Sequence, residues 1–159
     1  MSTAQPIKAE VIAKHVHALL QTNVTVKEVP AQDVKPPLVF GQIVDEAGAL
    51  VCVVLADVAC AGSTGAALSK IPSGAVTDLM RRNRPLDEDL LANYHEVVNV
   101  LTVLTTAALG RRTILRTVDQ TPKLADPQLL EFVKNAKHKL AYQVGVQGYP
   151  AGALNVYHV

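Results

Sequence analysis

Glu96 and Asn99 are the residues of this chain whose types and spacing are best suited to chemistry. They lie three positions apart in the longest segment with helical apolar periodicity, so a helix places a carboxylate and a carboxamide one turn apart. The apolar stripe of this segment, centred on Tyr94, falls on the opposite side of the helical wheel. We therefore expect Glu96 and Asn99 to face outward, flanked by Ala92 and Val103 on the same side.

This outward face predicts contact with another molecule. Ala92 and Val103 make its surroundings small and apolar, and a smooth patch with a few directional polar groups suits protein docking. The alternative interpretation is two solvated polar residues on an exposed helix. His95 lies about 100° around the helix from Glu96, at the edge of the same face, where it is either a general base or a boundary histidine.

Other clusters give weaker indications. Gly62-Ser63-Thr64-Gly65 at a helix start predicts either backbone binding of an anion or close packing of small residues, and it lacks a Walker lysine. Five arginines flank the long helix and either steer an acidic partner or solvate helix ends: Arg81, Arg82, Arg84, Arg111 and Arg112. The histidines and cysteines have no metal-ligand spacing, so we predict no metal site on the protein itself.

Composition limits the class of protein. A chain of 159 residues that is 49% hydrophobic favours a single domain over residues 1–159. A net charge of +1 and the absence of Trp argue against nucleic acid as a partner. Cys52 and Cys60 lie in or near an apolar run and are expected to be buried reduced thiols. There is no signal-peptide pattern and no apolar run of ~18 residues, so we expect no membrane span and a cytoplasmic location.

Local signals predict the elements that position the site. Asp87 can cap the long helix, Leu86 and Leu91 can form a hydrophobic staple, and Gly110 suits its end after Leu109. The fold class is α+β, with a mostly antiparallel sheet and long helices packed on it. The other expected helices cover residues 7–20, about 60–71, 76–80 and 126–139, and the expected strands cover 24–29, 38–44, 49–58, 113–118, 140–146 and 153–159.

The sequence resembles the chemotaxis phosphatases of the CheC, CheX and FliY type, and is closest to single-site, CheX-like members. Their signature has an Asp or Ser, a Glu, an Asn and, further on, a Pro. Here Glu96 and Asn99 have the family spacing, and residues 100 to 121 separate Asn99 from Pro122, as in the signature. Ala92 stands where the family has Asp or Ser. In the helix at 126–139, Lys134 follows Glu131 at the Asn position, so there is no second signature.

The resemblance implies hydrolysis of the aspartyl phosphate on a response regulator of the CheY type. Asn99 would position the attacking water, and Glu96 would dock to the active-site lysine of the partner. Ala92, Val103 and Pro122 would belong to the binding surface. The protein would need no cofactor of its own, because the Mg²⁺ is supplied by the response regulator.

Two alternatives follow from the same residues. Ala92 favours a non-catalytic module of the same fold, either a response-regulator-binding protein or a dimeric scaffold, and the glycine-rich turn leaves a small-molecule sensor open. A homodimer formed through sheet edges is also expected, with the strands at 140–146 and 153–159 supplying an edge.

Overall fold

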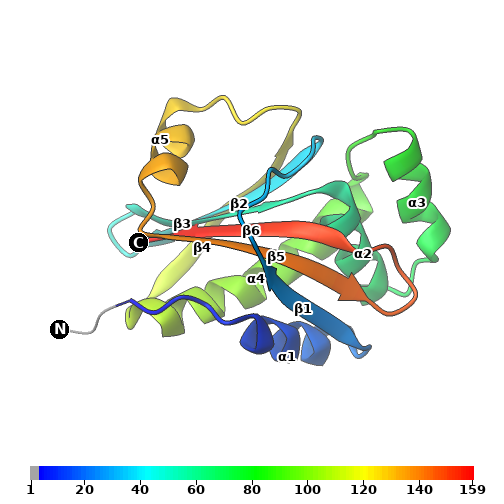
Figure 1. The fold of residues 1–159 in the computed structure, drawn as a ribbon, viewed down its shortest axis with the longest axis horizontal. Helices are drawn as coiled ribbons and strands as arrows, with labels where there is room; N and C mark the ends of the chain where they lie inside the picture. The colour runs from blue at the N-terminus through cyan, green and yellow to red at the C-terminus, as the bar shows by residue number, and fades with distance from the viewer. Residues whose placement is uncertain (1–3) are drawn as a thin grey trace.

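The structure, a computed structural model, describes residues 4–159 as an antiparallel sheet with helices packed on it (Figure 1). Its helices are α1 (Ala9–Leu20), α2 (Val58–Leu68), α3 (Ser73–Arg81), α4 (Glu88–Leu109) and α5 (Pro127–Asn135). Its strands are β1 (Val24–Val29), β2 (Leu38–Asp45), β3 (Leu50–Ala56), β4 (Thr113–Thr121), β5 (His138–Val146) and β6 (Gly152–His158). They form one sheet in the order β1-β5-β6-β3-β2-β4, which confirms the α+β prediction.

The two faces of this sheet are covered differently. Side chains alternate along a strand, so Cys52 and Val54 of β3 enter the large core beneath α1, α2 and α4. Val53 and Leu55 of the same strand point the other way, into a small cluster with Leu129 of α5. The helix that carries the predicted site therefore lies on the well-packed face, and α5 lies on the opposite face.

A connecting segment, residues 30–37, crosses the face that α5 only partly covers (Figure 1). β1 is at one edge of the sheet and β2 lies four strands away, so the chain between them passes over β5 and β6. Gln32 anchors it there: its Nε2 donates to the Tyr142 carbonyl oxygen and to Asn155 Oδ1, both at 3.1 Å. Asn155 Nδ2 donates in return to the Gln32 carbonyl oxygen at 2.9 Å.

Several predicted boundaries were wrong, and for two of them the reasons are local. α2 begins at Val58, inside the strand predicted for 49–58, because Asp57 caps it by accepting from the Cys60 N–H at 2.8 Å. The helix predicted for 126–139 ends at Asn135, and β5 starts at His138, where it pairs with His158 of β6. The predicted hairpin of 38–44 and 49–58 is confirmed as the β2–β3 pair.

The predicted sheet edge was also wrong. The strands at 140–146 and 153–159 correspond to β5 and β6, which lie inside the sheet with neighbours on both sides. The edges are β1 and β4, each hydrogen-bonded along one side only within the sheet of residues 4–159. Strand periodicity indicates which face of a strand is buried but carries no information on its partners.

Across residues 4–159, not one helix combines the length and the apolar character that crossing a membrane requires.

Candidate functional site

The start of α4 is held in place by its own cap and by the edge strand β4. Asp87 Oδ1 accepts from the Leu90 N–H at 2.9 Å, as predicted. Gln120 of β4 binds the backbone of Leu86 on both sides: its Oε1 accepts from the Leu86 N–H at 2.7 Å, and its Nε2 donates to the Leu86 oxygen at 3.0 Å. These bonds fix the position and rotation of the helix relative to the sheet.

The inward side of α4 packs closely on its neighbours, which determines what its other side presents. A Cβ on Gly41 of β2 would lie 2.8 Å from Val98 Cγ1, and a Cβ on Gly65 of α2 would lie 2.8 Å from the Leu90 oxygen. Both contacts need glycine, because a methyl group would not fit at these distances. The buried residues of α4 are Leu90, Tyr94, Val97, Val98, Leu101, Thr102, Leu104, Thr105 and Leu109.

The outward side of α4 carries the predicted site residues. Ala92 and Glu96 are exposed, Asn99 is half-buried, and Val103 has 61% of its surface exposed, which is unusual for a large apolar side chain. Within residues 4–159, neither Glu96 nor Asn99 makes a side-chain hydrogen bond or an ion pair. Both polar groups are therefore free to bind another molecule.

A groove of about 450 Å³ runs between this side of α4 and β4. Val118 lines it from the strand, and five residues line it from the helix: Glu88, Leu91, Ala92, His95 and Glu96. Asn99 lies one turn beyond the groove. His95 therefore lies at the edge of the surface that carries Glu96, as expected. The groove next to Glu96 is concave and could receive part of a partner molecule.

Pro122 is not among the residues that line the groove beside Glu96. It lines a separate cavity of about 430 Å³ near the start of α4, next to Pro85 and Thr121. Pro36, Pro37, Asn83 and Gln120 complete this second cavity. Pro122 follows the end of β4, so it lies beyond the strand that holds Leu86 in position.

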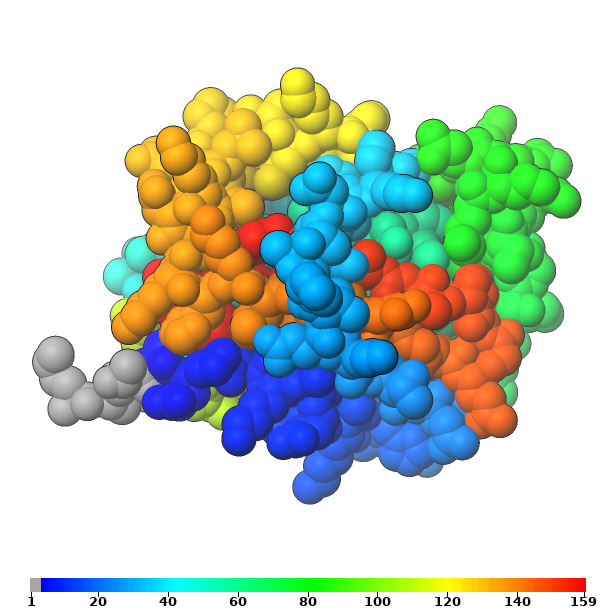
Figure 2. All heavy atoms as spheres, viewed as in Figure 1, coloured from blue at the N-terminus to red at the C-terminus, as the bar shows by residue number. Residues whose placement is uncertain are grey.

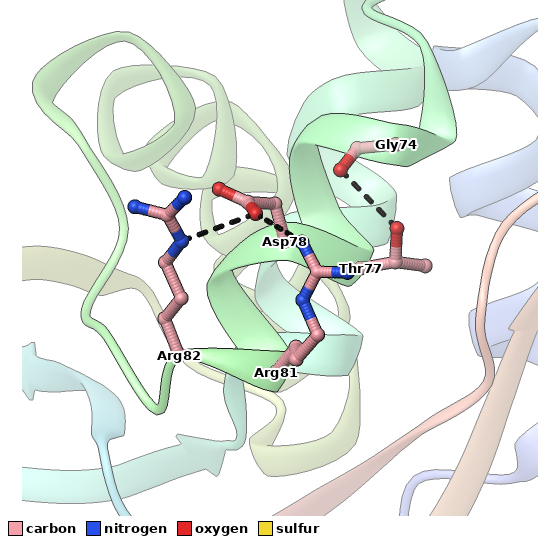
Figure 3. A network of polar contacts seen from close by, with 5 residues as sticks. All are labelled: Gly74, Thr77, Asp78, Arg81 and Arg82. Carbon is pink, nitrogen blue, oxygen red and sulfur yellow. Dashed lines mark hydrogen bonds and ion pairs between the residues drawn. The ribbon is translucent and has the colours of Figure 1, made fainter.

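The arginines around α4 are partly neutralised. Arg81 and Arg82 of the α3 end both contact Asp78 Oδ1, at 2.8 and 3.2 Å (Figure 3). Arg111, after α4, lies 3.5 Å from Asp45 Oδ2. These pairs are largely exposed and each contributes little to stability, roughly 0–1 kcal/mol. They also lower the net positive field that steering of an acidic partner would use.

The glycine-rich segment does not form an anion site at a helix start. Residues 62–65 lie in the middle of α2, whose N-cap is Asp57, so their backbone N–H groups are within the helix. All four are buried, and Gly65 allows the close approach of α4 described above. The interpretation as close packing of small residues is confirmed, and the proposal of a sensor pocket there loses its basis.

The described residues also bear on metal binding and thiol chemistry. In residues 4–159 no three His, Cys, Asp or Glu side chains are arranged to hold a metal ion. Cys52 and Cys60 are buried free thiols, as predicted. Burial raises the pKa of the Cys52 thiol to about 12, so it stays protonated and unreactive at neutral pH.

The site contains residues that sequence analysis missed. Gln120 and Val118, on β4, and Glu88, on α4, help to build the groove or to hold the helix beside it. The two β4 residues come from a strand far along the chain, and no periodicity links them to α4. The apolar residues of 113–121 do not alternate with polar ones, because Ile114 and Leu115 are adjacent, so this segment carries no signal that Val118 faces the helix.

Comparison with known proteins supports the fold at low sequence identity. The sequence matches no family model, and it has no significant match among curated proteins. Among solved structures, it is similar to Thermotoga maritima FliY, with a TM-score of 0.60, 16% identity, 95% of this chain covered and 87% of that chain. It is also similar to a chain of the CheX–CheY complex with BeF3 and Mg+2 from Borrelia burgdorferi, with a TM-score of 0.58, 12% identity, and 96% and 98% coverage.

A third similarity is to the FliM–SpeE complex from H. pylori, with a TM-score of 0.66, 10% identity, and coverage of 94% of this chain and 80% of that chain. The chain therefore has the fold of the CheC, CheX and FliY type, which the FliM middle domain shares. At these identities the likeness concerns the fold, and it does not separate a CheX-like protein from a FliM-like one.

Proposed function

We propose that this protein is a CheX-like phosphatase that hydrolyses the aspartyl phosphate of a CheY-type response regulator. The observation that carries the proposal is the outward face of α4, where Glu96 and Asn99 stand one turn apart with the family spacing. Neither side chain has an intramolecular partner within residues 4–159, and a groove opens beside Glu96. The similarity in fold to CheX and FliY supports the same assignment.

Asn99 is the residue proposed to act on the reacting water. Hydrolysis of an aspartyl phosphate passes through a loose transition state, so it needs mainly an in-line water and neutralisation of charge. A carboxamide can accept a hydrogen bond from the water with its oxygen and donate to a phosphoryl oxygen with its nitrogen. It brings no negative charge towards the phosphate. The half-buried position of Asn99 limits its rotamers, which favours a single orientation of the amide.

Glu96 is the residue proposed to position the partner. Its carboxylate is exposed and would be repelled by a phosphoryl group, but it can pair with a lysine next to that group. The Mg²⁺ bound to the response regulator supplies charge neutralisation at the phosphoryl oxygens. The contribution of this chain is therefore limited to docking by Glu96 and to placing the water by Asn99.

The second candidate is a non-catalytic binding module of the same fold. Exposed Ala92 favours it, because it offers no polar group one turn before Glu96, where the signature has Asp or Ser. The similarity to the FliM middle domain is compatible with this alternative. In that case the α4 face would bind a receiver domain without changing the lifetime of its phosphate.

The two candidates are separated by kinetics with phosphorylated receiver domains from the same genome. We expect the wild type to accelerate phosphate release, and Glu96→Gln to raise the concentration needed for half-maximal acceleration. Asn135→Ala, an exposed residue at the end of α5, is the matched control and leaves the kinetics unchanged. Binding without acceleration by the wild type would support the binding module, and no acceleration with any receiver would exclude the phosphatase.

A further inference from the structure

A cavity of about 360 Å³ lies on the face of the sheet opposite α4, away from the proposed phosphatase site. Its floor is β5 and β6, and its walls are α5 and the crossing segment at residues 30–37. Figure 2 looks onto this face, where β6 appears in red at the bottom of a recess between the orange α5 region and the blue crossing segment. The volume is at the lower end of the range for small-molecule sites, ~300–1,000 Å³.

Lys139 and Tyr157 place two hydrogen-bond donors side by side in this cavity. They are register partners on β5 and β6 and both line the cavity, so their side chains are neighbours on its floor. Lys139 Nζ donates to the Lys134 oxygen, in the last turn of α5, at 2.6 Å. This bond holds the ammonium in place and leaves two of its hydrogens for another acceptor.

The hydroxyl of Tyr157 is oriented by a buried amide. Asn155 Nδ2 donates to the Tyr157 oxygen at 2.9 Å, so the phenolic hydrogen is left to donate elsewhere. Within residues 4–159 it has no acceptor. Asn155 is only 3% exposed and is itself held by two hydrogen bonds to Gln32. The crossing segment, which carries Gln32, therefore helps to fix the orientation of the Tyr157 hydroxyl.

The other residues that line the cavity indicate the polarity and charge of a molecule that could bind there. Val133 and Ala141 are apolar, which favours a compact hydrocarbon body. Asp33 is the acidic residue of the lining, and it is exposed on the crossing segment. An anion with a single charged end can reach the two donors while its apolar part fills the rest of the cavity.

We propose that this cavity binds a small organic carboxylate with a compact apolar body, whose carboxylate accepts hydrogen bonds from Lys139 Nζ and the Tyr157 hydroxyl. A carboxylate fits the pair formed by the Lys139 ammonium and the Tyr157 hydroxyl better than phosphate does, because phosphate carries more charge and needs more donors. Lys134 also lines the cavity, and its positive charge adds to the attraction for an anion. The proposal is independent of the phosphatase assignment, since it uses none of the residues of α4.

The test is an NMR titration of the full chain with 3-phenylpropionate, compared with 3-phenylpropylamine and inorganic phosphate. We expect saturable shifts for the carboxylate at the amides around Lys139, Asn155 and Tyr157, and none there for the amine or for phosphate. Asp33→Asn is expected to strengthen binding of the carboxylate, because it removes a repulsive charge. Absence of saturable shifts with the carboxylate, or equal shifts with the amine, would overturn the proposal.

Variants in the cavity make the test specific. A hydrogen bond to a charged group contributes ~1.5–3 kcal/mol, so Lys139→Gln and Tyr157→Phe are each expected to weaken binding about tenfold or more. Lys137→Gln, an exposed lysine outside the cavity lining, is the control and leaves the affinity unchanged. Circular dichroism and melting temperature establish that each variant is folded. Unchanged affinity in both cavity variants would contradict the assignment of the two donors.

Discussion

His158 is buried next to a second histidine, so we expect the folding stability of the protein to depend on pH through this single residue. Its ring stacks on His138 with centroids 4.6 Å apart, and its Nδ1 bonds to the Val159 oxygen at 2.7 Å. The Nε2 atoms of both rings are buried without a partner within residues 4–159. Burial lowers the pKa of His158, and the positive charge of a protonated His138 lowers it further.

This lowered pKa predicts how stability depends on pH. The unfolded chain has a His158 pKa near the usual ~6.5 and binds a proton more readily than the folded chain. The contribution of His158 to stability is therefore constant above about pH 6.5 and falls below it, by at most ~1.4 kcal/mol per pH unit, until His158 is protonated in the folded state too. Urea unfolding from pH 5 to pH 8 measures this dependence.

The contribution of His158 can be isolated by substitution. His158→Phe keeps an aromatic ring on His138 and removes the titrating group, so the slope below about pH 6.5 should decrease. His15→Phe changes an exposed histidine and should leave that slope as in the wild type. An identical slope in the wild type and in His158→Phe would show that other groups cause the acid sensitivity.

At the level of elements, the close packing of α2 against α4 supports the site face. Gly65 of α2 leaves room for the Leu90 oxygen of α4. In addition, Asn93 Nδ2 of α4 donates a hydrogen bond to the Gly65 oxygen at 2.9 Å. Because the Leu90 oxygen is backbone, a side chain at position 65 would push the two helices apart. The outward presentation of Glu96 and Asn99 thus depends on a residue on another helix.

Gly65→Ala is therefore expected to destabilise the fold by roughly 1–3 kcal/mol, the usual cost of overpacking. Gly74→Ala is the matched control, because a Cβ there meets nothing within 4 Å and the residue lies in α3. Alanine is favoured over glycine in helices, so this control should be neutral or stabilising by ~0.5–1 kcal/mol. Thermal unfolding of both variants provides the comparison, and equal stability would refute the packing argument.

How much of these elements could be predicted from sequence depends on how local the signals are. The end of α4 was predicted correctly, and its start at Glu88 directly follows the predicted cap, because Asp87 and Gly110 act within one turn. The outward direction of Glu96 follows from helical periodicity alone. The contribution of Gln120 and the interior position of β5 and β6 could not be predicted, since both depend on strand pairing between distant segments.

At the scale of the whole molecule, the arrangement of the sheet separates two surfaces. α4 and the proposed phosphatase site lie on the core side, and the cavity with Lys139 lies on the opposite side. The sheet ends in β1 and β4, and within the described residues neither has a strand neighbour on its outer side. Unpaired edge strands allow a second copy to extend the sheet.

We therefore still predict a homodimer, but with its interface at an edge strand, β1 or β4, and not at β5 and β6. Sedimentation equilibrium should give twice the chain mass of 17.0 kDa. Glu28→Pro in β1 should lower the dimer fraction if that edge is used, because the Glu28 N–H faces away from β5 and proline cannot donate to a strand partner. A monomer at all concentrations would contradict the prediction.

The most direct test of the phosphatase account is the decay of phosphorylated receiver saturated with this protein, measured in a single turnover. At saturation the rate reports chemistry and not binding. The account predicts faster decay with the wild type than with receiver alone, and a spontaneous rate with Asn99→Ala, which still binds the receiver and keeps the wild-type melting temperature. Equal decay with the wild type and Asn99→Ala would contradict the role assigned to the amide.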